Sequence, residues 1–141
     1  MKNQFSELID YIPKIENGVS GKWIFDNEND GTPEHPKRMP YVKYSESIED
    51  FVESLYHYCD EHPEFDHKSY GETLKSLNLE WTSTSMQNAD VSEMDAKSVI
   101  ALLIGAVRAD RFCEGALFGF FKNGCILRWL SRLEEIGEEK Q

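Results

Sequence analysis

The stretch Ser98-Val-Ile-Ala-Leu-Leu-Ile-Gly-Ala-Val107 decides the fold, because it is the longest uncharged run in the apolar part of the chain. Residues 99–107 are apolar on every side of a helix, which is typical of a helix enclosed by other elements. Ser92, with Asp95 three residues later, can begin this helix, and we expect it to continue to about Phe112. Its ten uncharged residues are about half of what crosses a bilayer, so the run predicts a buried central helix.

Amphipathic stretches on both sides of this run supply the helices that would surround it. Their apolar residues recur at helical spacing, and serine, proline, asparagine and glycine residues mark their ends. We expect the N-terminal helix to end at Pro13, and the stretch from Thr82 to Asp90 to be a polar loop. The expected helices cover residues 5–12, 45–62, 69–77, 92–112, 117–123 and 126–136. The sequence therefore predicts a mostly α, single domain over residues 1–141, with about six helices around the buried one.

A long segment from Glu16 to Tyr44 lacks apolar periodicity and is interrupted by glycines and prolines. Two short apolar stretches remain, Trp23 to Phe25 and Tyr41 to Tyr44, so a minor β-hairpin across Asp26 to Pro40 is one interpretation. Ordered loops of this length are uncommon without a function or firm packing. We therefore expect a long ordered loop at 16–44 that is functional or lies on the core, and a short solvated tail at 138–141.

Composition and charge exclude several classes of protein. With 141 residues, 40% of them hydrophobic, the chain can bury a core and is not disordered. Its formal net charge of -11 would repel a nucleic acid duplex or an anionic membrane, so neither is an expected partner. The three cysteines are too few for a disulfide framework, and the N-terminus lacks the features of a secretion signal. These observations favour a cytoplasmic protein.

Two patterns resemble metal sites without completing one. Asp26-Asn-Glu-Asn-Asp-Gly31 matches the beginning of a calcium-binding loop, but Lys37 stands where the closing glutamate should be. An acidic turn explains this stretch better. Histidines 57, 62 and 67 recur every five residues and would not converge on a helix, while Cys59 and His62 form at most half of a zinc site. We predict no metal site and no cofactor.

Two arginines, Arg108 and Arg111, lie one helical turn apart at the end of the central helix. Their guanidinium groups could hold a small anionic ligand, with Asp30, His35 or Glu114 as an acid or base. The alternative is internal pairing, Arg111 with Glu114 and Arg108 with an acid of the long loop, which would fasten that loop to the core. Internal pairing is the prediction we favour.

A stripe of small residues, Ala101, Gly105 and Ala109, repeats at steps of four along the central helix. Small residues let another helix approach closely. That neighbour can be a helix of the same chain, which is the more common case in soluble proteins, or the partner in a symmetric homodimer.

Two parts of the chain show a resemblance to a known family. They are the stretch from Asn29 to Ser45 and the stretch from Asp90 to Gly115, which continues into Gly124 to Leu130. They resemble a family of small, uncharacterised bacterial proteins known only as a domain of unknown function. The resemblance covers nearly the whole chain and implies a bacterial cytoplasmic protein. It implies no activity, cofactor or catalytic residue.

Two hypotheses about function follow. The first is a non-enzymatic helical binding or regulatory protein that self-associates, since the sequence shows no catalytic motif and is rich in aromatic residues that suit an interface. The second is an enzyme or sensor for a small anionic ligand held by Arg108 and Arg111. The sequence leans away from an enzyme without deciding the question. A cavity beside the two arginines would favour the second hypothesis.

Overall fold

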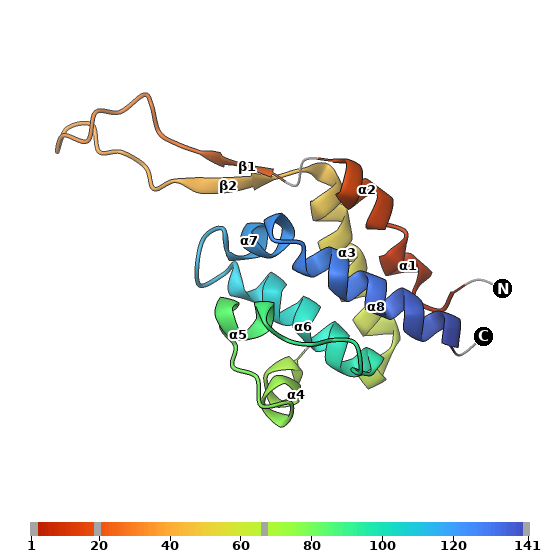
Figure 1. The fold of residues 1–141 in the computed structure, drawn as a ribbon. Coiled ribbons are helices and arrows are strands. Elements are labelled where there is room, and N and C mark those ends of the chain that lie inside the picture. The colour runs from red at the N-terminus through yellow and green to blue at the C-terminus, as the bar shows by residue number, and fades with distance from the viewer. Residues whose placement is uncertain (1–2, 19–20, 66–67, 140–141) are drawn as a thin grey trace.

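The computed structural model describes residues 3–18, 21–65 and 68–139, and these form a helical body with one two-stranded sheet (Figure 1). The elements are α1 (Ser6–Ile9), α2 (Ile12–Asn17), β1 (Gly21–Ile24), β2 (Tyr41–Tyr44), α3 (Glu46–Glu61), a 3-10 turn η1 (Pro63–Phe65), α4 (Tyr70–Ser76), α5 (Ser83–Gln87), α6 (Ala96–Ala109), α7 (Ala116–Lys122) and α8 (Cys125–Glu139). The predicted mostly α fold with a minor β-hairpin is confirmed. No helix in the described ranges is both long and apolar enough to span a membrane.

Helix α6 is the buried helix that the uncharged run predicts. All of its residues from Ser98 to Val107 are buried, and it lies between α4, α7 and α8. Its N-cap is Asp95, whose carboxylate accepts a hydrogen bond from the Ser98 N–H at 2.9 Å. The helix ends at Ala109, earlier than the expected Phe112, because the chain turns tightly through residues 110–115.

Gly105, the middle residue of the small-residue stripe, faces other elements of the same chain. A Cβ atom added at Gly105 would lie 3.0 Å from Met86 Cε and 3.5 Å from both Leu74 Cδ1 and Trp81 Cδ1. The Trp81 indole N–H also donates a hydrogen bond to the Gly105 carbonyl at 2.9 Å. At Gly105 the intramolecular alternative therefore holds, because α4 and α5 occupy the space that the missing side chain leaves.

Two predictions about short segments are wrong. The expected N-terminal helix is two short helices, and Pro13 lies in the first turn of α2 rather than at a helix end. A proline fits there because first-turn N–H groups have no partner within the helix. The expected polar loop from Thr82 to Asp90 contains α5, where the Thr82 hydroxyl accepts a hydrogen bond from the Ser85 N–H and Met86 is buried against α6.

Residues 21–44 form a β-hairpin that we call the arm. Strands β1 and β2 pair antiparallel from Gly21 with Tyr44 to Ile24 with Tyr41. The connection between them, residues 25–40, extends away from the helical body (Figure 1). Residues 16 and 17 of the segment expected as a loop belong to α2. Of the two alternatives for this segment, a functional loop or one that lies on the core, the second does not hold for residues 25–40. At the other end of the chain, Glu138 and Glu139 are exposed but still helical, and 140–141 lie outside the described residues.

Candidate functional site

The turn between α6 and α7, residues 110–115, holds the base of the arm. The Glu114 carboxylate accepts a hydrogen bond from the Val42 N–H at 2.8 Å, so the body binds the backbone of β2 directly. The half-buried Asp110 carboxylate accepts hydrogen bonds from the Tyr44 hydroxyl at 2.9 Å, the Gly115 N–H at 3.1 Å and the Leu117 N–H at 3.3 Å. One carboxylate oxygen thus joins the arm, the turn and the start of α7.

Tyr44 is the residue of β2 that binds Asp110. Its hydroxyl donates to Asp110 and accepts a hydrogen bond from the Phe118 N–H at 3.0 Å. Burial, and then the hydrogen bond to Asp110, raises the pKa of Tyr44 above its ordinary value. The tyrosine therefore remains a protonated donor, and its role at this position is to hold β2 against α7.

Gly115 allows the arm to lie close to the body. Its φ angle is +85°, a conformation that favours glycine, and a Cβ atom there would collide with the Trp23 indole. The side chain of Val42 would also lie 3.3 Å from that Cβ position. The arm and the turn therefore pack directly against each other at this glycine.

Next to this contact is a depression in the body, which we call the groove. It has a volume of about 420 Å³ and lies between α5, the end of α6 and α7. Trp81, Met86, Phe112 and Phe120 provide apolar walls, and Glu114 is its one ionisable carboxylate. The Trp81 and Phe112 rings meet edge to face with their centroids 5.4 Å apart. Phe112 is nevertheless 76% exposed, which is unusual for a phenylalanine.

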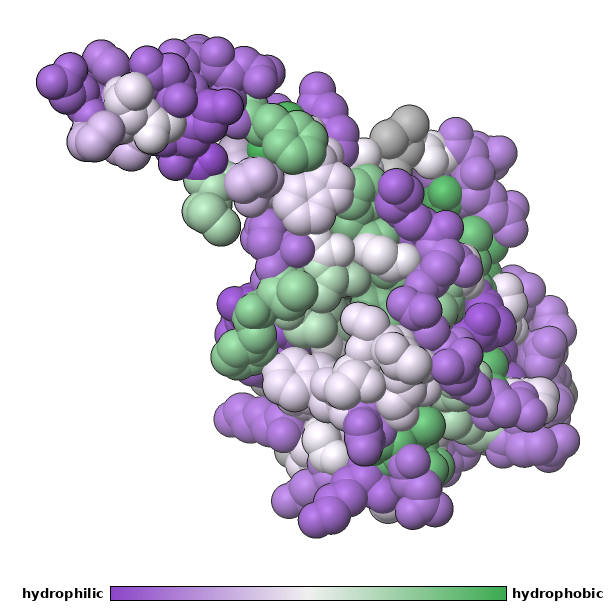
Figure 2. All heavy atoms as spheres, turned by 60° about the vertical axis from the view of Figure 1, so that its left-hand side comes forward, coloured by the Kyte–Doolittle hydropathy of each residue, from purple (hydrophilic) through white to green (hydrophobic). Residues whose placement is uncertain are grey.

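The large hydrophobic side chains that are exposed in the described part of the chain all belong to the arm or the groove. On the arm they are Trp23, Phe25, Met39 and Tyr41; in the groove they are Trp81 and Phe112. We call this set the aromatic surface. Figure 2 shows apolar and weakly polar residues gathered at the base of the arm and on the body below it. The surface is concave where the arm leaves the body.

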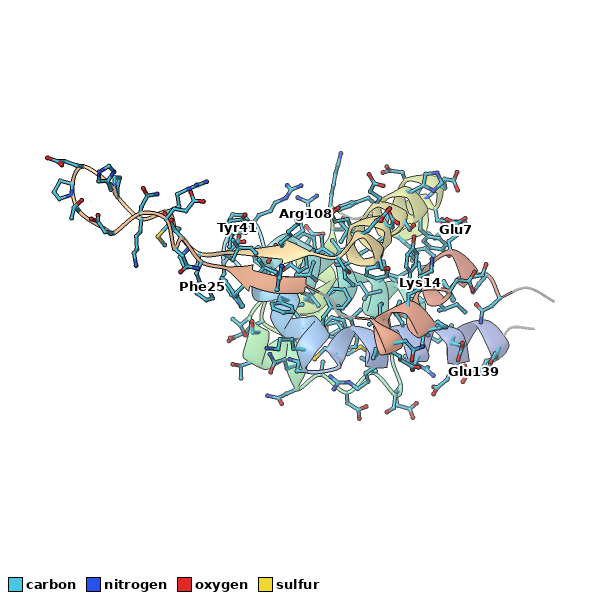
Figure 3. All side chains as sticks on the ribbon, turned by 90° about the horizontal axis from the view of Figure 1, so that it is seen from above. Glu7, Lys14, Phe25, Tyr41, Arg108 and Glu139 are labelled. Carbon is cyan, nitrogen blue, oxygen red and sulfur yellow. The ribbon has the colours of Figure 1, made fainter. Side chains whose placement is uncertain are left out.

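The structure does not bring the five candidate residues Arg108, Arg111, Glu114, Asp30 and His35 together. Arg108 lies on the body, where its guanidinium group is 5.9 Å from the ring centroids of both Tyr56 and Tyr70 (Figure 3). Arg111 lines a different pocket of about 310 Å³, and Arg108 is not among the residues that line it. Two carboxylates, Glu49 and Asp110, line the same pocket, so an anion there would meet two negative groups as well as one guanidinium.

In the described part of the chain no ion pair joins Asp30 to Arg108 or Arg111, so the favoured prediction of a loop acid that fastens the arm is wrong for Asp30. The Asp30 carboxylate accepts hydrogen bonds from the N–H and the hydroxyl of Thr32, and His35 forms an isolated bridge with Thr32. All three residues lie in the part of the arm that extends away from the body. Short-range turns satisfy these polar groups, so they need no contact with the core.

The predicted pair of Arg111 with Glu114 is also wrong, since no ion pair joins these two described residues. Glu114 instead accepts the hydrogen bond from Val42. The base of the arm is held to the body by Asp110, Tyr44, Glu114 and the Trp23–Gly115 contact instead. Sequence reasoning missed Asp110 and Tyr44 because they are 66 positions apart and belong to no recognised motif.

Arg111→Ala is expected to lower the free energy of unfolding by less than about 0.5 kcal/mol, because Arg111 is exposed and substitutions at such surface positions have small effects. Urea unfolding of both proteins would measure this. Adding millimolar phosphate is expected to leave the melting temperature of the wild type unchanged. Stabilisation by phosphate in the wild type but not in Arg111→Ala would instead support the anion-binding hypothesis.

The acidic turn at residues 26–31 is held by hydrogen bonds of its own. The Asp26 carboxylate accepts hydrogen bonds from the Arg38 N–H at 2.7 Å, and from the side-chain amide and N–H of Asn29. These bonds, the one from Arg38 first, keep the pKa of Asp26 well below its ordinary value. The carboxylate therefore stabilises the turn through these hydrogen bonds.

Millimolar calcium is expected to leave the melting temperature of the protein unchanged. The oxygens of Asp26 already accept hydrogen bonds, and Lys37 stands where a calcium loop has its bidentate glutamate. Thermal melts across a calcium titration would test this. A saturable rise in melting temperature would overturn the interpretation of residues 26–31 as a simple turn.

Among the described residues, a further cluster has metal-ligand side chains. Glu7 of α1 and Glu61 of α3 lie on either side of His57, 3.7 Å from its Nδ1 and 3.3 Å from its Nε2. All three are exposed, and the carboxylates face opposite ring nitrogens, so the arrangement suits an imidazole between two acids. Of the residues considered as zinc ligands, Cys59 is buried, and the His62 ring packs on the Tyr58 ring with their centroids 4.2 Å apart. His67 lies outside the described residues.

Comparison with known proteins gives one match. A family model described as a family of unknown function, DUF6508, matches residues 1–139. No curated protein and no solved structure matches the chain.

Proposed function

This chain belongs to the DUF6508 family, whose function is unknown, and we propose that it is a non-enzymatic protein-binding module that uses the aromatic surface. The observation that carries the proposal is the location of the exposed large hydrophobic residues. Those in the described part of the chain are confined to the arm and the groove. Monomeric soluble proteins rarely expose such contiguous patches unless the patch binds something.

The composition of this surface suits a protein partner. Tryptophan, tyrosine, phenylalanine and methionine are the residues enriched at the centres of protein interfaces, and charged residues are depleted there. The aromatic surface contains all four of these types. The groove that forms part of it is open and continuous with the arm through the Trp23–Gly115 contact.

The base of the arm also gives the surface a fixed geometry. Hydrogen bonds from Val42 to Glu114 and from Tyr44 to Asp110 connect β2 to the body at two points. A surface that is already ordered loses less conformational entropy when it binds.

The proposal extends to the place of action, which we infer to be the bacterial cytoplasm. The family resemblance supports a bacterial source. The exposed thiol of Cys113, in the groove, suits a reducing compartment, where it is not oxidised.

Site-specific photo-crosslinking tests the proposed function. A benzophenone amino acid would replace Phe112 in the groove, Phe25 on the arm, or Glu139, which lies at the opposite end of the molecule (Figure 3). We expect positions 112 and 25 to give the same covalent adduct with one protein, in cells that express the chain, and position 139 to give none. The proposal fails if the first two positions give no protein adduct, or if position 139 gives the same adduct.

A further inference from the structure

We infer that the partner of the aromatic surface is a second copy of this chain, with the arm of each copy lying in the groove of the other. The inference rests on the proposed function, because it names the protein that occupies the same surface. The distribution of charge, the match between arm and groove, and the presence of one arm and one groove on each copy support it.

The charge distribution is the first argument. The arm, residues 21–44, is formally neutral because four basic residues balance four acidic ones: Lys22, Lys37, Arg38 and Lys43 against Asp26, Glu28, Asp30 and Glu34. The net charge of -11 therefore belongs entirely to the rest of the chain. Two bodies in direct contact would bring like charges together, whereas contact between a neutral arm and an acidic body adds no like-charge repulsion at the interface.

The groove is suited to receive the apolar part of such an arm. Its one ionisable carboxylate, Glu114, already accepts the hydrogen bond from Val42, and its walls are mainly aromatic and aliphatic. On the arm, Phe25 is 60% exposed and Met39 is 84% exposed, and both lie just beyond the paired strands. Burial of these two side chains against Trp81 and Phe112 would remove apolar area from water on both partners.

The shape of the molecule favours exchange between two identical copies. Each copy presents one projecting arm and one groove, and the surface between arm and body is concave (Figure 2). In a two-fold symmetric pair each arm occupies the partner's groove, so both contacts form at once and the assembly closes at two copies. A two-stranded hairpin alone is marginally stable in water, and packing on a second copy would stabilise it.

Sedimentation equilibrium of the full chain at micromolar concentration tests the inference. We expect a dimer for the wild type and at least tenfold weaker dimerisation for both Phe25→Asp and Phe112→Asp, which place a charge at the proposed contact. Gln4→Asp, an exposed position near the N-terminus, is the matched control and should remain dimeric. Both substituted residues are largely exposed in one copy, so far-UV circular dichroism spectra like that of the wild type should show that the variants fold.

Crosslinking tests the arrangement of arm and groove. Cys113 is exposed in the groove, while Cys59 and Cys125 are buried and therefore slow to react. With a short bismaleimide, we expect Met39→Cys to give a product of twice the chain mass on a denaturing gel, and the same variant with Cys113→Ser to lose it. A product of unchanged mass, from linkage within one chain, would contradict exchange.

The outcomes separate the two proposals. A wild-type dimer that both aspartate variants leave intact would overturn the inference. A monomeric wild type, together with photo-crosslinking of positions 112 and 25 to a different protein, would overturn the second copy as partner and leave the proposed function standing. A monomer with no crosslinked protein at either position would overturn both.

Discussion

Gly105→Leu is expected to lower the free energy of unfolding by about 3 kcal/mol or more, the upper part of the range for overpacked cores. Gly105 is buried in the middle of α6, and an added Cβ atom would already lie 3.0 Å from Met86 Cε. The remaining atoms of leucine would displace Met86, Leu74 or Trp81. Moving Trp81 would also break its hydrogen bond to the Gly105 carbonyl.

Urea denaturation measures this effect, with Gly119→Ala as the control. Gly119 is also a helical glycine, but an added Cβ atom meets nothing within 4 Å there. Because alanine favours helix more than glycine does, the control should be as stable as the wild type or up to about 1 kcal/mol more stable. A Gly105→Leu protein as stable as the wild type would mean that α6 is not enclosed by α4 and α5.

The body of the protein could be predicted from the sequence because its signals are local and periodic. The uncharged run from Ser98 to Val107 predicts a buried helix, and α6 is one. The apolar residues of α3 recur at helical spacing, so its buried face was also predictable. Both depend on residues within a few turns of one another.

Short elements were harder to predict, since few residues determine them. Pro13 is compatible with either the end of one helix or the first turn of the next, and only the packing of α2 on α3 and α8 decides. In α5, the run Ser-Thr-Ser is polar, and Met86 alone marks the face that packs on α6. A single apolar residue gives no periodicity to detect.

The direction of the arm could not be predicted, because it depends on contacts between distant residues. Val42 meets Glu114 across 72 positions, and no local pattern joins them. By charge alone, the acids of the loop are chemically reasonable partners for Arg108 and Arg111. However, Asp26 and Asp30 accept hydrogen bonds from backbone N–H groups two or three residues away or across the arm, and those local bonds form without the entropic cost of closing a long loop.

Asp110→Ala is expected to lower the free energy of unfolding by about 2 to 4 kcal/mol and to release the arm from the body. Without the carboxylate, the Tyr44 hydroxyl and the N–H groups of Gly115 and Leu117 lose their shared acceptor in a half-buried position. Each unsatisfied buried donor costs about 1 to 3 kcal/mol when water cannot replace the lost bond. The arm should lose its contact with the body before the helices unfold, because the bond from Tyr44 to Asp110 holds β2 against the body.

Two matched variants separate the role of the carboxylate from that of the tyrosine. Asp110→Asn keeps one acceptor oxygen and should lose less stability than Asp110→Ala. Tyr44→Phe removes the hydroxyl that donates to Asp110 and accepts from Phe118, while Asp110 keeps its bonds to the turn. Urea unfolding measures the free energy of unfolding, and the rate of limited proteolysis at residues 25–40 measures how firmly the arm is held.

Asp110→Ala could instead unfold like the wild type, with an arm that is cut no faster. Asp110 then does not fasten the arm, and the Glu114–Val42 bond and the packing of Trp23 on Gly115 must hold it alone.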